Sequence, residues 1–285
     1  MFLVTGATGT VGRAVIDHLL AEGLPVRAIT RRPEAARLPA EVEVVRADLS
    51  DAASLPAALA GVDRVFLSTA GPEIASHDAN LAAAAAVAGI GRIVKLSSGR
   101  AGDVAAADPI PAWHRAGEEA VRASGVAWTM VRPMGFMSNV LHWTGSIRES
   151  GTVRAPFGQG RIAVVDPRDI AAVAVAALTE PGHAGQVYTV TGPEALSAAE
   201  QTAVLAEILG RPLRFEEITP ERARADLERF GVEPELAAAI MALRATALES
   251  FTSVVHPTVA AVTGRAPRSF QEWAFEYRAK FTAAQ

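Results

Sequence analysis

Thr5-Gly6-Ala7-Thr8-Gly9-Thr10-Val11-Gly12 is the stretch of this sequence that decides its fold. It follows the apolar run Phe2–Thr5, which predicts a strand, and it opens a segment whose apolar residues recur every four positions on one helical face. Glycines three apart in such a turn let backbone approach a pyrophosphate, and the unpaired N–H groups at the start of the helix face it. A second strand at Val26–Thr30 completes the unit that a dinucleotide site requires. The competing interpretation is a tight structural turn without a ligand.

The predicted cofactor contacts lie in this turn and after the next three strands. They are Gly6, Thr8, Gly9, Thr10, Val11 and Gly12 in the turn, then Arg31, Arg32, Asp48, Leu49, Ser68, Thr69 and Ala70. Such loops follow the carboxyl ends of strands, where open α/β sheets bind ligands. Asp48 and Leu49 would meet the adenine edge, and Ser68 to Ala70 the nicotinamide ribose. For each loop, ordinary loop chemistry without a ligand is the alternative.

The end of the second strand predicts the choice of cofactor. An acidic residue there would accept a hydrogen bond from the ribose 2′-hydroxyl of NAD, but this chain has Arg31 and Arg32 instead. A planar guanidinium matches a 2′-phosphate with two charge-assisted hydrogen bonds. The sequence therefore predicts a preference for NADP(H), with NAD(H) as the alternative, unless the two arginines only form a solvated turn before Pro33.

Short β-rich runs alternate with Ala-rich helical stretches through the first half, which predicts an α/β fold with a Rossmann-type, doubly wound parallel sheet. The predicted strands are Phe2–Thr5, Val26–Thr30, Val42–Arg46, Arg64–Ser68, Arg92–Leu96 and Ala127–Arg132. Residues 1–150 are assigned to the dinucleotide-binding domain. Residues 151–285 are assigned mostly to a smaller, mainly helical domain that covers the substrate, with about 166–190 returning to the core as a helix at Asp169–Leu178 and a strand at Gln186–Val190.

Composition excludes several classes of function. With 285 residues, half of them apolar, and a formal charge of −4, the chain has no basic surface for nucleic acid and no apolar stretch that predicts a membrane span. No cysteine is present, so thiolate chemistry and disulfides are excluded. The scattered histidines predict no metal site. The N-terminus shows no leader pattern, so a cytoplasmic protein is expected, and a homodimer is left open.

The motifs together resemble a known group, the NmrA-like branch of the atypical short-chain dehydrogenases/reductases, which includes quinone reductases and redox-sensing regulators. The resemblance rests on GATGTVG, TRRPE, ADLSD, VKLSS, a helix from His to Glu that ends in ASG, and WTMVRP with the following GFM, which span residues 3 to about 137. DPRDIAAVAVAAL and QVYTVTGPE extend it toward residue 194. The remainder matches only in helical character.

The usual proton donor of the wider superfamily is missing. Ordinary members use a Tyr and a Lys four residues apart. Here the tyrosines are Tyr188 and Tyr277, whose +4 positions are Gly192 and Phe281. Simple ketone reduction by that route is therefore disfavoured, which agrees with the NmrA-like branch itself.

A different set of side chains remains near the expected nicotinamide position. Lys95, Ser97 and Ser98 end the fifth strand, and His114 is placed at the start of a helix predicted at Arg115–Ala123. The resemblance implies a His at that position in quinone-reductase-like members, where it could donate a proton or a hydrogen bond to a quinone oxygen. Otherwise His114 caps the helix or lies exposed beside Trp113. For Lys95, a role in strand pairing or at the rim of the core is the alternative to catalysis.

Apolar and aromatic residues around the sixth strand suggest a substrate surface. The predicted substrate contacts are Trp113, Met134, Phe136, Met137, His142 and Trp143. Such a surface suits a flat aromatic acceptor, although the same spacing is also typical of plain core.

Three functions follow from these observations. The first is an NAD(P)H-dependent oxidoreductase that transfers hydride to a quinone or another conjugated aromatic acceptor, for which stacking and positioning replace a dedicated Tyr acid. The second is a redox sensor that binds NADP(H) without turning it over. The third is a tailoring enzyme of secondary metabolism, a reductase or monooxygenase acting on an aromatic polyketide.

Overall fold

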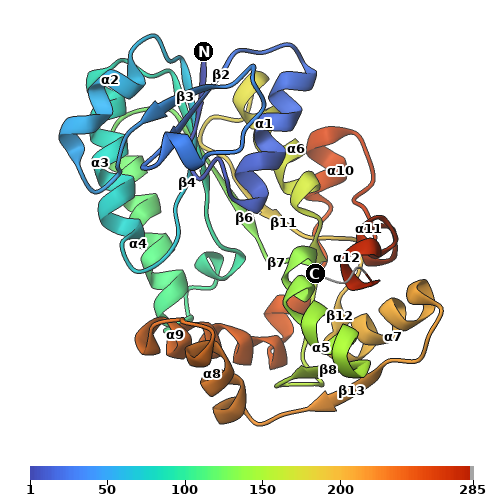
Figure 1. The fold of residues 1–285 in the computed structure, drawn as a ribbon. Helices are drawn as coiled ribbons and strands as arrows, with labels where there is room; N and C mark the ends of the chain where they lie inside the picture. The colour runs from blue at the N-terminus through green and yellow to red at the C-terminus, as the bar shows by residue number, and fades with distance from the viewer. Residues whose placement is uncertain (283–285) are drawn as a thin grey trace.

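The computed structural model describes residues 1–282 and contains a central sheet of seven parallel strands (Figure 1). In spatial order the strands are β11 (Val187–Val190), β6 (Trp128–Pro133), β5 (Arg92–Leu96), β4 (Arg64–Ser68), β1 (Phe2–Val4), β2 (Val26–Thr30) and β3 (Glu43–Arg46). The order reverses between β1 and β4, where ligands bind in doubly wound sheets. The predicted Rossmann-type fold is confirmed.

Helices cover both faces of the sheet because the buried strands are apolar on both sides. Leu3 and Val65 point into one core, shared with helices α2 (Leu55–Leu59), α3 (Ile74–Val87) and α4 (Pro109–Ala123). Their neighbours Val4 and Phe66 point into the other core, shared with α1 (Thr10–Ala21) and α6 (Pro167–Thr179). This alternation divides the strand residues between the cores on the two faces of the sheet.

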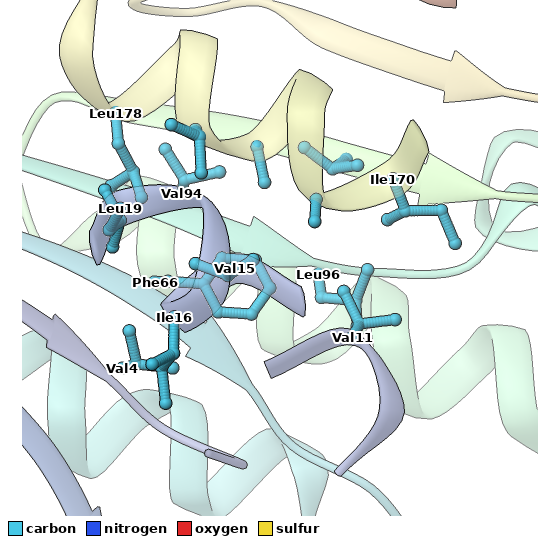
Figure 2. Close-up of a cluster of buried hydrophobic side chains, with 14 of the residues drawn as sticks. Val4, Val11, Val15, Ile16, Leu19, Phe66, Val94, Leu96, Ile170 and Leu178 are labelled. Carbon is cyan, nitrogen blue, oxygen red and sulfur yellow. The ribbon is translucent and has the colours of Figure 1, made fainter. Parts of the chain in front are cut away.

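Helix α1 is seated by its apolar face. Figure 2 shows Val11, Val15 and Leu19 from this helix lying among Phe66 of the sheet and Leu178 of α6. The four-residue spacing seen in the sequence is therefore the packing face of α1, and it aims the start of the helix at the glycine turn.

Element bounds follow the predictions to within a residue or two, with one larger correction. The helix predicted at Arg115–Ala123 begins at Pro109, with Asp108 before it. Proline is tolerated in the first turn of a helix because the N–H groups there have no partner within the helix. Pro109 and Pro111 therefore belong to the helix, and His114 lies inside it and does not cap it.

The chain after β6 forms the second part of the molecule. Its strands pair in three two-stranded sheets, and several of its helices pack around an apolar cluster that includes Trp143, Phe270 and Trp273. The remaining elements are β7 (Gly135–Phe136), η4 (Met137–Trp143), α5 (Thr144–Ser150), β8 (Thr152–Ala155), β9 (Arg161–Ile162), β10 (Val164–Val165), β12 (Leu196–Ser197), α7 (Ala198–Leu209), β13 (Arg214–Glu217), α8 (Pro220–Arg229), α9 (Pro234–Ala245), α10 (Thr258–Thr263), α11 (Phe270–Tyr277) and α12 (Ala279–Thr282), with short 3₁₀ turns η1 (Pro33–Ala35), η2 (Ala52–Ser54), η3 (Gly99–Gly102), η5 (Thr246–Leu248) and η6 (Ser250–Ser253).

Two segments of this later chain return to the sheet. Helix α6 packs on α1, and β11 adds to the edge of the sheet beside β6. The helix predicted at Asp169–Leu178 and the strand predicted at Gln186–Val190 are thus present with slightly different bounds. The proposed division at residue 150 stays a prediction. Among residues 1–282, no helix is both long and apolar enough for a membrane crossing.

A buried arginine ties the two parts together. Arg100, in η3, is 4% exposed and forms ion pairs with Asp103, Asp108 and Glu249. Its guanidinium also lies over the ring of Phe251. The loop after β5 is therefore anchored to the chain that follows α9.

Candidate active site

A cavity of about 340 Å³ opens at the carboxyl edge of the sheet, at the switch point between β1 and β4. Its walls come from the ends of β1, β4 and β5, the starts of α1, α3 and α4, and, from the second part, β7 and α9. The lining residues are Gly6, Gly9, Thr10, Val11, Gly12, Ser68, Thr69, Ala70, Gly71, Ile74, Leu96, Ser97, Ile110, Trp113, His114, Phe136 and Leu236.

Each of the three glycines of the turn lies close to neighbouring protein atoms, so that side chains at these positions would crowd the turn. Gly6 has a φ of +58°, and a Cβ on Gly12 would lie 2.2 Å from the carbonyl oxygen of Gly6. Gly9 precedes α1 and offers no side-chain cap, and the first turn of α1 holds no acidic residue. The N–H groups at the start of α1 therefore face the cavity without a protein anion, which suits a pyrophosphate.

The ends of β1 and β4 are joined beside this turn. The Thr5 hydroxyl donates to the carbonyl of Ser68 at 2.9 Å and accepts from the N–H of Ser68 at 2.7 Å. A Cβ on Gly6 would lie 3.0 Å from the Ser68 hydroxyl oxygen. The predicted residues Ser68, Thr69 and Ala70 thus follow directly beside the glycine turn and line the same cavity.

Behind Thr69 lies a fully buried ion pair. Lys95 and Asp78 are both 0% exposed, and the Lys95 ammonium contacts the Asp78 carboxylate, which also accepts from the Thr69 hydroxyl at 2.8 Å. Burial raises the pKa of Asp78, while Lys95 and Thr69 act in the opposite direction. Lys95 was predicted as a catalytic candidate, but the structure places it beneath the cavity wall, where it acts on the site through its charge.

His114 lines the cavity with its imidazole and is partly buried. Its Nδ1 atom is buried and has no hydrogen-bond partner among the described residues. Burial lowers the pKa of His114 to about 3, the positive charge of Lys95 acts in the same direction, and Glu118 opposes them. The imidazole is therefore neutral near pH 7. It can donate one N–H hydrogen bond, but it lacks the second proton of an imidazolium. The alternative of a helix cap is wrong.

One helical turn after His114, Glu118 is the centre of a second buried group of charged and polar side chains. It is fully buried and accepts two hydrogen bonds from Arg132, at 2.8 and 2.6 Å, and one from the Ser97 hydroxyl at 2.6 Å. Burial alone would raise the pKa of Glu118, but these donors outweigh it and hold the pKa below its usual value. Since the Ser97 proton is committed to Glu118, the Ser97 oxygen can only accept from a ligand. The neighbouring Ser98 does not line the cavity and begins the η3 turn.

The predicted contacts to the adenosine end lie outside the cavity wall. Arg31 and Arg32 are exposed, and neither side chain has a hydrogen-bond or ion-pair partner within residues 1–282. Two hydrogen bonds from Ser50, at 3.0 and 2.8 Å, hold the Asp48 carboxylate and lower the pKa of Asp48, with a smaller contribution from Arg31. Asn80 donates to the Leu49 carbonyl at 2.8 Å. Thr8 also lies outside the lining residues.

The predicted substrate surface divides into three groups. Trp113 and Phe136 line the cavity. Met134 packs against Gly99, outside the cavity lining. Met137 and Trp143 are buried in the apolar cluster around α11, where they are plain core, and His142 lies at the surface end of η4.

Several cavity residues were not predicted from the sequence, among them Leu96 at the end of β5. Ile74 begins α3, Ile110 lies in the first turn of α4, and Leu236 lies in α9. The flanking prolines hid the helical position of Ile110. Leu236 is 100 residues beyond Phe136 in the chain and shows no local signal at all.

A substitution at Gly117 tests the buried pair. A Cβ there would lie 2.1 Å from Asp78 Oδ2, so Gly117→Ala should force the ion pair apart and destabilise the fold by about 1–3 kcal/mol. Thermal unfolding measures the change. Gly145→Ala is the matched control, because Gly145 also lies in a helix and a Cβ there meets nothing within 4 Å. Equal melting temperatures for the two variants would contradict the packing described.

Comparison with known proteins agrees with this geometry. The family described as NAD(P)H-binding matches residues 6–181. The (4-alkanoyl-5-oxo-2,5-dihydrofuran-3-yl)methyl phosphate reductase of Streptomyces griseus is 49% identical over 282 residues, 99% of each chain. The NAD(P)H azoreductase of Xenophilus azovorans is 42% identical over 287 residues, 100% of each chain. The NADPH complex of an NADPH-dependent quinone oxidoreductase from Escherichia coli superposes with a TM-score of 0.84 at 26% identity, covering 97% of this chain and 99% of that one. The chain belongs to the NAD(P)H-binding family.

Proposed function

We propose that the protein is an NAD(P)H-dependent reductase that transfers hydride to a flat, conjugated acceptor bound against Trp113, His114 and Phe136. One observation carries this proposal: a single cavity joins the glycine turn to an aromatic wall and a neutral imidazole. The azo, quinone and oxo-dihydrofuran reductases to which the chain is similar support the acceptor class. A quinone, an azo compound and an unsaturated lactone share a planar conjugated system that can lie flat on a nicotinamide ring.

The residues present fit the cofactor. The backbone N–H groups of the glycine turn would hold the pyrophosphate, the absence of side chains at Gly9 and Gly12 keeps the start of α1 close against the turn, and Ser68 to Ala70 would face the nicotinamide ribose. Arg31 would hold a 2′-phosphate. Bound NAD(P)H supplies the hydride, and the protein supplies the alignment.

His114 would act on the acceptor through its neutral imidazole. An acceptor atom that receives hydride-derived electrons gains negative charge, and a positioned N–H donor stabilises that charge without becoming ionised. The place of His114 in the cavity lining and its neutral imidazole support this role. Ser97 would accept a hydrogen bond from the ligand on the same side of the cavity.

Substitution of Arg31 tests the cofactor preference. Arg31→Ala should weaken NADPH binding about 10- to 100-fold and leave NADH binding nearly unchanged, because a hydrogen bond to a charged group contributes about 1.5–3 kcal/mol. Fluorescence titration of both cofactors measures this. Arg214→Ala removes an exposed charge from β13 and should change neither affinity. Equal affinities of the unaltered protein for NADPH and NADH would contradict the preference.

The protonation state of His114 can be observed directly. A histidine in a peptide titrates near 6.5, whereas His114, with its pKa lowered to about 3, should show no titration between pH 5 and 8 in ¹H–¹⁵N NMR of the imidazole. Because the depressed pKa belongs to the folded state, the contribution of His114 to stability is full above pH 6.5 and is lost as the pH falls toward 3. A midpoint near 6.5 would show that the imidazole is not held neutral.

Replacement of His114 separates its role from cofactor binding. His114→Ala should slow acceptor reduction about 10²-fold, the low end for loss of one such group, because stacking and hydride alignment remain. NADPH affinity should stay nearly unchanged. NADPH oxidation with a panel of quinones, azo compounds and unsaturated lactones, each beside an enzyme-free control, gives the rates. Unaltered rates in His114→Ala would show that His114 takes no part in the reaction. An absence of turnover by the unaltered protein with every acceptor would favour a redox sensor.

A further inference from the structure

A buried cluster of charged side chains joins the start of α4 to the chain that follows α9. At its centre is Arg100, which is 4% exposed. Its guanidinium donates to Asp103 at 2.6 Å, to Asp108 at 3.2 Å and to Glu249 at 2.7 Å. We call these four residues the Arg100 cluster. The two aspartates belong to the loop before α4, whereas Glu249 lies after α9 and η5, so the cluster connects segments that are far apart in the chain.

Asp108 takes part in this cluster and not in the usual capping of a helix. An Asp just before a helix ordinarily accepts from the N–H of the second or third helical residue. The third residue of α4 is Pro111, which has no N–H, and Asp108 makes no such capping hydrogen bond. Its carboxylate accepts from Arg100 instead. The start of α4 is therefore held through Arg100.

The Glu249 end of the Arg100 cluster is fixed within the second part of the molecule. Thr252, three residues later and 2% exposed, donates through its hydroxyl to the carbonyl of Arg161 at 3.0 Å. The carbonyl of Thr252 accepts from the N–H of Ala163 at 2.9 Å. The turn that carries Glu249 is thus attached to β9 and to the residue that follows β9.

Both helices that the Arg100 cluster connects form walls of the cavity. Ile110, Trp113 and His114 line it from the first two turns of α4, and Leu236 lines it from α9, which packs against α4 (Figure 1). Among residues 1–282, the contact of Arg100 with Glu249 is the one ion pair that joins the loop after β5, or α4, to the chain beyond α9. The separation of the two walls therefore depends on Arg100.

We propose that Arg100 is a positioning residue that sets the width of the cavity between α4 and α9 and thereby selects acceptors by size. The inference rests on the proposed function and goes beyond it, because it assigns the selection to a residue outside the cavity lining. An apolar pocket distinguishes ligands that differ by one methylene only while its walls keep their separation. The planar fork of one guanidinium serves three carboxylates here, and the single ammonium of a lysine could not replace it.

Two quinones that differ by one fused ring, 1,4-benzoquinone and 1,4-naphthoquinone, test the proposal. Glu249→Gln removes the carboxylate beyond α9 and leaves the other ion pairs of Arg100 in place. The ratio of the two kcat/KM values should shift about 10-fold in favour of naphthoquinone, because the wall formed by α9 is no longer held against α4. NADPH affinity should stay unchanged. Glu228→Gln, which breaks a surface ion pair with Arg224 inside α8, is the matched control and should leave the ratio as it is.

The ratio separates size selection from a purely structural role. Loss of a merely structural contact would lower the melting temperature and reduce both kcat/KM values together. An unchanged ratio in Glu249→Gln therefore overturns the proposal, whatever the melting temperature. Arg100→Lys keeps the charge without the fork and should shift the ratio in the same direction. If Arg100→Lys does not fold, Glu249→Gln alone decides, because the Glu249 side chain is half-exposed.

Binding measurements keep this proposal distinct from the proposed function. Calorimetry gives the dissociation constants of both quinones for the NADP⁺ complex of the full chain and of its variants. If the unaltered protein reduces neither quinone but the ratio of dissociation constants shifts in Glu249→Gln, the reductase is overturned and the size selection stands. If the unaltered protein binds neither quinone, both proposals are overturned.

Discussion

The contact between helix α1 and the turn at Gly6 is the constraint on which the rest of the molecule depends. With no side chain on Gly12, the helix sits so close to the turn that its first N–H groups face the cavity directly. Val11 and Val15 hold the helix there against the sheet. Any retreat of α1 would leave the carboxyl ends of β1 and β4 without an anion-binding wall, and the cavity would lose the end that receives a dinucleotide.

The parts that depend on local chain order could be predicted from the sequence, and the parts that depend on distant packing could not. The glycine turn, the alternation of strands and helices, and the positions of Ser68, Trp113 and Phe136 follow from periodicity and from the rule that strands end at one edge. Lys95 shows the limit. Nothing in its neighbours along the chain reveals that Asp78, 17 residues earlier, neutralises it in the interior.

The predicted substrate surface also shows that distant packing cannot be predicted from the sequence. Phe136 and Met137 are adjacent in the sequence, yet one lines the cavity and the other belongs to the core of the second part. Their side chains diverge because a two-residue strand passes into a 3₁₀ turn at this point. A pattern of apolar spacing cannot distinguish the two, since burial in a core and exposure to a flat ligand select the same residue types. Leu236 enters the cavity only because α9 packs against α4.

The complete burial of the pair between Lys95 and Asp78 has a consequence for how the protein responds to dissolved salt. Ions screen exposed charges over about 10 Å at 0.1 M ionic strength, but they do not reach charges enclosed by protein. Burial, with a smaller contribution from the enclosed charge of Lys95, keeps His114 neutral, and this effect is therefore nearly independent of ionic strength. Arg31 is exposed, so the attraction that we propose between Arg31 and a 2′-phosphate would weaken as salt rises. The enclosed charges thus act on the His114 end of the cavity whatever the salt concentration, whereas the exposed Arg31, which we propose for the choice of dinucleotide, would respond to it.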